Sequence, residues 1–285
     1  MIRKLMQYVK GHKLQFVLAL SLAIATVLTG IGLMSTSGYL ISRAAQRPML
    51  VDLFVVTAAV RFFGISRAIV RYAERVVSHD LIFRILSVMR SLLYRKLDSL
   101  SLKWMMGRKS GDLLASLVGN IDTLQNAFLR ILSPAVAAFV ISVLTFAGLL
   151  FFDTGLAIAT LVFLALSGIA IPLLAIRLAK GTGSDDVALK SDLKAYFVDR
   201  LMGLQDLIWL GQKPKTAEEV AVIQKQINTI RRRNAGISGM LEGLHTLMAH
   251  LGMFTVLIMA IPLVLSGSIP GVMLAMLTLG VLSSF

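Results

Sequence analysis

Three arginines and one histidine recur at intervals of four residues in one segment of the chain. Arg67, Arg71, Arg75 and His79 form what we call the arginine stripe. Residues four apart lie on one face of a helix, so the stripe drifts only slowly around the helix axis. Arginine binds carboxylates through paired hydrogen bonds. One interpretation of this spacing is therefore a site for an anionic ligand.

The helices that would carry these side chains are apolar. The 285 residues are 56% hydrophobic and 15% charged, with a mean hydropathy of +0.80, whereas soluble domains carry about 25% charged residues. The absence of cysteine excludes disulfides, thiolate catalysis and iron–sulfur clusters. Four windows contain no Asp, Glu, Lys or Arg, namely 14–42, 131–152, 154–176 and 243–285. Each is long enough to cross a membrane core of about 30 Å.

We expect an all-α membrane fold of six spans. The last window is divided by turn residues at 266–271, and a weaker span carries the arginine stripe. The sixth span has 15 residues, about 22 Å of helix, which is too short to cross. We therefore expect a truncated sixth helix and a chain that is part of a longer protein. The expected spans are 14–42, 53–83 extending to 100, 122–152, 154–200, 216–265 and 271–285.

Basic residues predict the orientation of these spans. Residues 1–13 carry four Lys and Arg, residues 84–130 carry eight, and residues 177–233 carry eleven. The turns near 153 and 266–270 carry none. Because Lys and Arg accumulate on the cytoplasmic side, the N-terminus and these three regions are expected in the cytoplasm. The net charge of +14 is then explained without a nucleic-acid partner.

The arginine stripe also has a structural interpretation. A charge near the bilayer centre costs about 2.5–3.5 kcal/mol, so several on one helix need compensation. A water-filled cavity holding an anionic ligand provides it. Ion pairs with Glu74 and Asp80, or extension of the arginines to water at the cytoplasmic leaflet, provide it equally well. His79 could likewise be a hydrogen-bonded packing residue, and the residues alone leave these alternatives open.

Two other features of the spans are candidates for packing or for function. Tyr39 follows hydroxyl residues 35–37 at the end of the first span. These side chains could line a translocation path, or they could bond between helices. Gly239 and Gly243, on the fifth span, have the small-xxx-small spacing that is typical of close helix packing.

The two large cytoplasmic regions are predicted to be helical hairpins. Apolar residues continue at helical spacing through 84–100 and 218–233. Between these extensions lie segments with cap and turn residues, where we expect a short helix at each tip. The candidate tip residues are Ser110, Gly111 and Asp112 in the first hairpin, and Gln205 and Asp206 in the second.

This plan resembles the transmembrane half of six-helix, domain-swapped type I ABC exporters. Its motifs look like those of the CydC-type subunits of CydDC thiol-reductant exporters, and the likeness covers essentially the whole chain. The strings that carry it lie at 38–42, 65–67, 71–80, 110–114 and 122–125. The R-Y-x-E-R-x-x-S-H-D pattern at 71–80 is the most specific of them.

The resemblance implies a place and partners for the chain. It implies a multi-pass protein of the bacterial inner membrane that forms a heterodimer with a CydD-type half-transporter. Its tip segments would be coupling helices seated on nucleotide-binding domains. It further implies export of cysteine or glutathione to the periplasm in support of cytochrome bd assembly, and haem b binding at His79.

The sequence departs from the full-length family pattern at the ATP site. It contains no G-x-x-x-x-G-K-[ST] motif, and the glycine-rich stretch 181–184 lacks the lysine that reaches the phosphates. We therefore expect no ATPase site on this chain alone. ATP and Mg²⁺ would act through a nucleotide-binding domain that these 285 residues lack.

Two functions fit these observations. In the first, the chain is the membrane subunit of an ATP-driven exporter, with Arg67, Arg71, Arg75 and Tyr39 as substrate-binding residues. In the second, it is a haem-binding or haem-translocating module for cytochrome assembly, with His79 as the ligand. The tip segments favour the first, because a passive haem carrier has no use for them. A secondary transporter is less favoured, since the charge-free spans lack its broken helices and midplane carboxylates.

Overall fold

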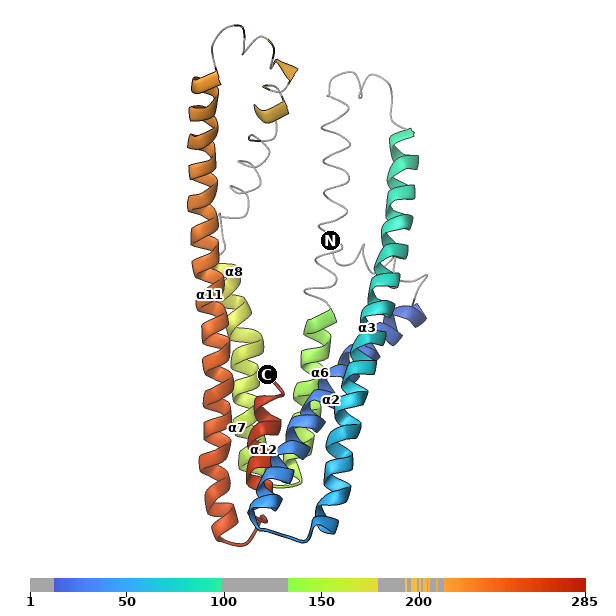
Figure 1. The fold of residues 1–285 in the computed structure, drawn as a ribbon, viewed down its shortest axis with the longest axis vertical. Coiled ribbons are helices and arrows are strands. Elements are labelled where there is room, and N and C mark those ends of the chain that lie inside the picture. The colour runs from blue at the N-terminus through green and yellow to red at the C-terminus, as the bar shows by residue number, and fades with distance from the viewer. Residues whose placement is uncertain are drawn as a thin grey trace. The chain divides into compact units, whose positions relative to one another are not determined.

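The computed structural model describes residues 13–98, 133–178 and 213–285, together with a few positions between 193 and 209 (Figure 1). Every element in these ranges is helical. In chain order the elements are α2 (Lys13–Ala45), α3 (Leu50–Asp98), α6 (Ser133–Leu150), α7 (Thr154–Ala165), the π-helical segment η3 (Leu166–Ala170), α8 (Ile171–Leu178), α11 (Lys213–Leu265) and α12 (Met273–Leu282).

Five helical stretches among the described residues are long and apolar enough to cross a membrane. They are α2, Leu50–Leu92 of α3, α6, the continuous run Thr154–Leu178, and Glu218–Leu265 of α11. Both ends of α2, α3, α11 and α12, the end of α6 and the start of α7 lie within three residues of the expected bounds. The sixth expected span contains α12, which is a shorter apolar helix. Parts of the third and fourth expected spans, at 122–132 and 179–192, lie outside the described residues.

Two helices are far longer than a bilayer requires. α3 has 49 residues and α11 has 53. At 1.5 Å per residue these are about 74 and 80 Å, more than twice the hydrocarbon thickness. Both helices therefore continue into water, which is what the apolar spacing beyond the spans predicted.

The chain divides into two compact units, of which the first comprises residues 1–164 and 252–285. Its main core lies where α6, α7, the end of α11 and α12 meet. Leu156, Ala157, Val256 and Ala260 are fully buried there. The turn between α11 and α12 falls at the expected break, and Gly267 adopts a left-handed φ of 78° within it. Only glycine takes this conformation without strain.

In this first unit α2 packs against both α3 and α12. A Cβ added to Gly38 would lie 2.5 Å from the backbone oxygen of Ala275 in α12. A Cβ added to Gly32 would lie 2.6 Å from the Phe63 ring of α3. Neither position has room for a side chain, so small residues let α2 approach both neighbours closely.

The second unit comprises residues 165–251. Its described parts are η3, α8, most of α11 and the positions between 193 and 209. In it η3 widens one turn between α7 and α8, and π-helical turns of this kind often occur at functional positions. Gly239 and Gly243 belong to this unit, and an added Cβ at either would meet no described atom within 4 Å. The close packing predicted from their spacing is therefore wrong for the described residues.

Candidate functional site

The arginine stripe lies along α3, but its members do not share one environment. Arg67 is half-buried, whereas Arg71, Arg75 and His79 are exposed. Each step of four residues turns the side chain by about 40° around the helix, so the direction changes by about 120° from Arg67 to His79. The stripe thus begins at the contact with α2 and ends on the exposed side of α3.

Arg67 is accommodated by a glycine of the neighbouring helix. The guanidinium carbon and Nε of Arg67 lie 3.6 Å from the position that a Cβ on Gly30 would occupy. Gly30 is buried within α2. A larger side chain at residue 30 would compete with the guanidinium for this space, so the glycine holds open the place where the charge lies.

Two carboxylates stand beside the stripe, and neither pairs with its arginines in the described structure. Glu74 is half-buried and accepts a hydrogen bond of 2.9 Å from Ser78 Oγ. Asp80 accepts a bond of 2.8 Å from Arg84 Nε and one of 3.4 Å from Gln15 Nε2. Within the described ranges, the ion pairs that would lock helices through the stripe are therefore not formed.

His79 lies on the exposed face, one turn before an aromatic ring. Its ring centroid is 6.2 Å from that of Phe83, with the planes tilted by 35°. No hydrogen bond joins His79 to Asp80, whose oxygen accepts from Arg84 and Gln15. Haem needs an iron ligand and a cationic partner for a propionate. The accessible imidazole of His79 and the guanidinium of Arg75, one turn away, fit these two needs.

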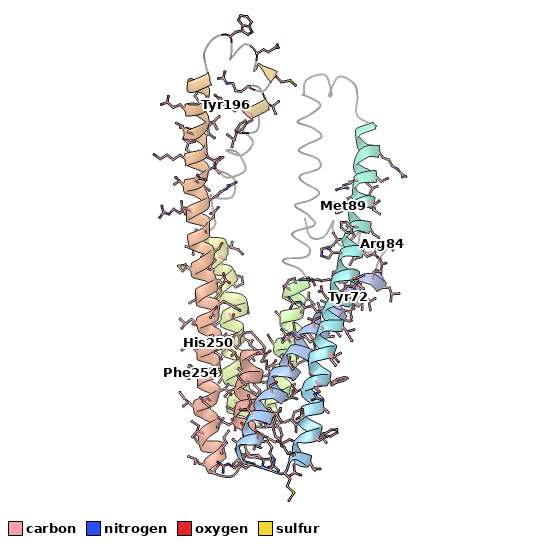
Figure 2. All side chains as sticks on the ribbon, in the orientation of Figure 1. Tyr72, Arg84, Met89, Tyr196, His250 and Phe254 are labelled. Carbon is pink, nitrogen blue, oxygen red and sulfur yellow. The ribbon has the colours of Figure 1, made fainter. Side chains whose placement is uncertain are left out.

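A small apolar cluster anchors α3 just beyond His79. Leu81, Ile82, Ile85 and Leu86 are buried against Ala19 of α2. Figure 2 shows Arg84 and Met89 on this part of α3, with Tyr72 nearer the start of the same helix. The cluster fixes the two helices together, so Glu74 and Ser78 are held by a packed helix pair.

Tyr39 is half-buried on α2, and its hydroxyl has no hydrogen-bond partner in the described part of the chain. The neighbouring hydroxyls have roles within the protein. Thr36 donates to the backbone oxygen of Gly32 at 2.7 Å, and Ser35 fits against Gly280 of α12. Packing therefore accounts for these two hydroxyls, and Tyr39 remains a candidate for cargo contact.

A second polar contact occurs inside the apolar part of the other unit. Ser167 of η3 lies 2.6 Å, Oγ to Nδ1, from His245 of α11. Ser167 is buried. His250 is exposed and bonds instead to the backbone oxygen of Thr246 in its own helix (Figure 2). Residues five apart on a helix differ in direction by about 140°, and the two histidines thus face different surroundings.

Most of the predicted tip residues lie outside the described residues. These are Ser110, Gly111, Asp112 and Asp206. Gln205 is described and exposed. Near it, Met202 is 87% exposed and Trp209 is 88% exposed.

The same region contains a polar cluster that sequence reasoning missed. The hydroxyl of Tyr196 donates to Glu219 of α11, and Arg200 pairs with the same carboxylate at 3.3 Å (Figure 2). The Arg200 guanidinium also lies 4.9 Å from the centre of the Tyr196 ring. The hydrogen bond to Glu219 raises the pKa of Tyr196 above its ordinary value, because it stabilises the neutral phenol.

Comparison with known proteins places this fold in a family. Residues 14–283 match the ABC transporter transmembrane region. No nucleotide-binding domain is found in the 285 residues. The all-helical exporter fold predicted from the sequence is thus confirmed.

The chain is similar to three curated proteins, each a glutathione/L-cysteine transport system ATP-binding/permease protein. It is 32% identical to CydD of Bacillus subtilis over 210 residues, which are 73% of this chain and 36% of that protein. It is 30% identical to CydC of Escherichia coli over 291 residues, 100% of this chain and 51% of that protein. It is 28% identical to CydC of Haemophilus influenzae over 232 residues, 81% of this chain and 40% of that protein.

The chain spans about half, or less, of the length of these relatives. CydD and CydC match it almost equally, so the predicted likeness holds for the CydDC pair and not for CydC alone. The five long apolar helices make it a multi-pass membrane protein. By fold, by the match over residues 14–283 and by these relatives, the chain belongs to the ABC transporter transmembrane region family.

Proposed function

We propose that this chain is the membrane-spanning part of an ATP-driven bacterial exporter that moves cysteine or glutathione from the cytoplasm to the periplasm. The observation that carries the proposal is Arg67, whose guanidinium is half-buried against Gly30 and forms no ion pair with Glu74 or Asp80. Arg71 follows one turn later and is exposed. Both cargoes carry carboxylates, which arginine binds through two hydrogen bonds.

The position of Arg67 along α3 suits uptake from the cytoplasm. Arg67 is 17 residues after Leu50, where α3 begins, so it lies about 26 Å along the helix. A hydrocarbon layer of about 30 Å that starts near Leu50 would end just beyond this point. With the orientation that the basic residues predict, Arg67 and Arg71 lie towards the cytoplasmic leaflet, within reach of water and of cytoplasmic thiols.

The hairpin tips would transmit the conformational changes that accompany ATP hydrolysis to the membrane helices. The relatives are ATP-binding/permease proteins, and the exposed Met202 and Trp209 flank Gln205. We assign this tip as one contact with a nucleotide-binding domain. We assign residues 110–112 as a second such contact. A CydC- or CydD-type half-transporter would complete the heterodimer.

Cargo-stimulated ATP hydrolysis by the complete transporter in lipid nanodiscs tests this function. Cysteine or glutathione should stimulate hydrolysis, and Arg71→Ala should raise the required cargo concentration by about tenfold or more, the usual effect of losing a charged hydrogen bond. Arg61→Ala is the control, because it removes an exposed arginine from the same helix about 15 Å away. Equal effects of the two variants, or no stimulation of the unmodified protein, would contradict the proposal.

A haem-binding role is the second candidate, and the exposure of His79 next to Arg75 favours it. His79 would ligate the iron, and Arg75 would bind a propionate. Haem titration followed by absorption in the Soret region tests this role. His79→Ala should abolish the spectrum of bound haem, while thiol-stimulated ATP hydrolysis persists. An unchanged spectrum in His79→Ala would remove His79 as the ligand.

A further inference from the structure

Glu74 is a carboxylate without a cationic partner in the described structure. It lies on α3, seven residues beyond Arg67, and is half-buried. Its one hydrogen bond among the described residues comes from Ser78 Oγ, at 2.9 Å. Ser78 is 8% exposed, so the hydroxyl that orients the carboxylate is itself fixed by packing. A half-buried charge is costly unless a counter-charge meets it.

The arginines of the stripe do not supply that counter-charge, although they are near in sequence. Arg71 precedes Glu74 by three residues and Arg67 by seven, which places them about 60° and 20° from it around α3. Within the described ranges, no ion pair of 4.0 Å or less joins Glu74 to either arginine. One side of α3 therefore carries opposite charges that remain separate.

A ligand that bears both charges would satisfy both groups at once. Arg71 and Glu74 are about 4.5 Å apart along the helix axis, and an α-amino acid carries its carboxylate and ammonium on one carbon. Glutathione has the same pair on its γ-glutamyl end and a second carboxylate on glycine, for which Arg67 is available. An anion without an amino group would instead bring like charge towards Glu74.

We propose that Glu74, oriented by Ser78, binds the α-ammonium of the cargo, so that the site selects zwitterionic amino acids and peptides over anions that lack an amino group. This inference rests on the proposed function, in which the arginines bind the carboxylate. It adds a specificity residue to that site and excludes dianions such as haem from the same position.

A pair of thiols that differ only in the amino group tests the proposal. Cysteine and 3-mercaptopropionate share the thiol and the carboxylate, and their affinities would be measured on the complete transporter in nanodiscs under reducing conditions. The unmodified protein should bind cysteine about tenfold or more tightly, as expected for a hydrogen bond between charged groups. Glu74→Gln should weaken the binding of cysteine alone, and so bring the ratio of the two affinities close to one.

Two further variants sharpen the test. Ser78→Ala keeps the charge of Glu74 but removes its orienting bond, and should reduce the ratio by about threefold. Glu242→Gln is the matched control, because Glu242 is an exposed glutamate of α11, and it should leave the ratio unchanged. The proposal for Glu74 would be overturned if Glu74→Gln still preferred cysteine over 3-mercaptopropionate, or if the unmodified protein showed no such preference.

Arg71→Ala separates this inference from the proposed function. If it weakens both thiols equally while Glu74→Gln keeps the ratio, the arginine site stands and the role of Glu74 is wrong. If Arg71→Ala changes neither affinity, the arginine site fails, and the inference that rests on it fails with it.

Discussion

At the scale of single residues, the candidate site depends on two small side chains beside two charged ones. Gly30 leaves room for the guanidinium of Arg67, and Ser78 orients Glu74. The charged residues set the chemistry, while the small ones decide where the charges lie.

The first prediction concerns Gly30. Gly30→Leu should displace the Arg67 guanidinium and weaken cargo binding by about tenfold, similar to Arg67→Ala. Gly30→Ala should have little effect, since its Cβ would lie 3.6 Å from the guanidinium, an ordinary contact. Cargo affinity of the complete transporter is the measurement.

Gly148→Leu is the control for this prediction, because a Cβ at residue 148 would meet no described atom within 4 Å. If Gly30→Leu binds cargo as well as Gly148→Leu does, the space at Gly30 has no part in the site.

The sequence predicted which residues carry charge in this site but not how they are arranged. Spacing by four residues placed the arginine stripe on one side of α3, and the structure shows that the stripe rotates from a half-buried Arg67 to an exposed His79. The bond from Ser78 to Glu74 could have been predicted, since residues four apart on a helix are neighbours. The role of Gly30 could not, because it depends on how two separate helices meet.

At the scale of elements, the polar link between η3 and α11 is the most unusual contact. Ser167 of η3 and His245 of α11 lie 2.6 Å apart, from Oγ to Nδ1. The π-helical turn of η3 changes the helical register at Ser167. Ser167 is also the residue that contacts His245.

The second prediction concerns this bond. Ser167→Ala and His245→Ala should each destabilise the protein by roughly 0.6 kcal/mol, the mean value for hydrogen bonds between membrane helices. The double variant should cost less than the sum of the two, because each single change already removes the same bond. Unfolding free energies in detergent give this comparison, and strict additivity would show that the two side chains are not coupled.

The ends of α2 and the start of α7 were predictable because they lie close to the bounds of charge-free windows, whereas the long extensions of α3 and α11 were predictable from apolar spacing. Both ends of α2, α3, α11 and α12, and the start of α7, lie within three residues of the expected bounds. The π-helical turn was not predictable, since residues 166–170 contain no proline or other signal that marks an inserted residue. An added Cβ at Gly239 or Gly243 would meet no described atom within 4 Å, whereas close approaches occur at other glycines, among them Gly32, Gly38 and Gly280.

At the scale of the whole molecule, the proposed contact with a nucleotide-binding domain lies near Gln205. Trp209 and Met202 are almost fully exposed, and Tyr196 and Arg200 hold the nearby segment to Glu219 of α11. A force applied at this tip would therefore be passed to α11.

The third prediction is that Trp209→Ala in the complete transporter reduces cargo-stimulated ATP hydrolysis without changing cargo affinity. Tryptophans at the centre of protein interfaces typically contribute about 2 kcal/mol or more. The affinity should stay constant because the proposed cargo site lies on α3. Met240→Ala, an exposed methionine of α11, is the control. A loss of cargo affinity with normal stimulation would contradict the assignment of the tip.

The length of α3 has a mechanical consequence. The helix has 49 residues and contains no proline, so it can tilt as a single rod of about 74 Å. A tilt of about 5° around Leu50 would displace its far end by about 6 Å, but would move Arg67, about a third of the way along, by only about 2 Å. If cargo binds at the arginines as proposed, a small movement of α3 around the cargo would become a displacement about three times larger at Asp98, and a large displacement at Asp98 would become a small one at the arginines.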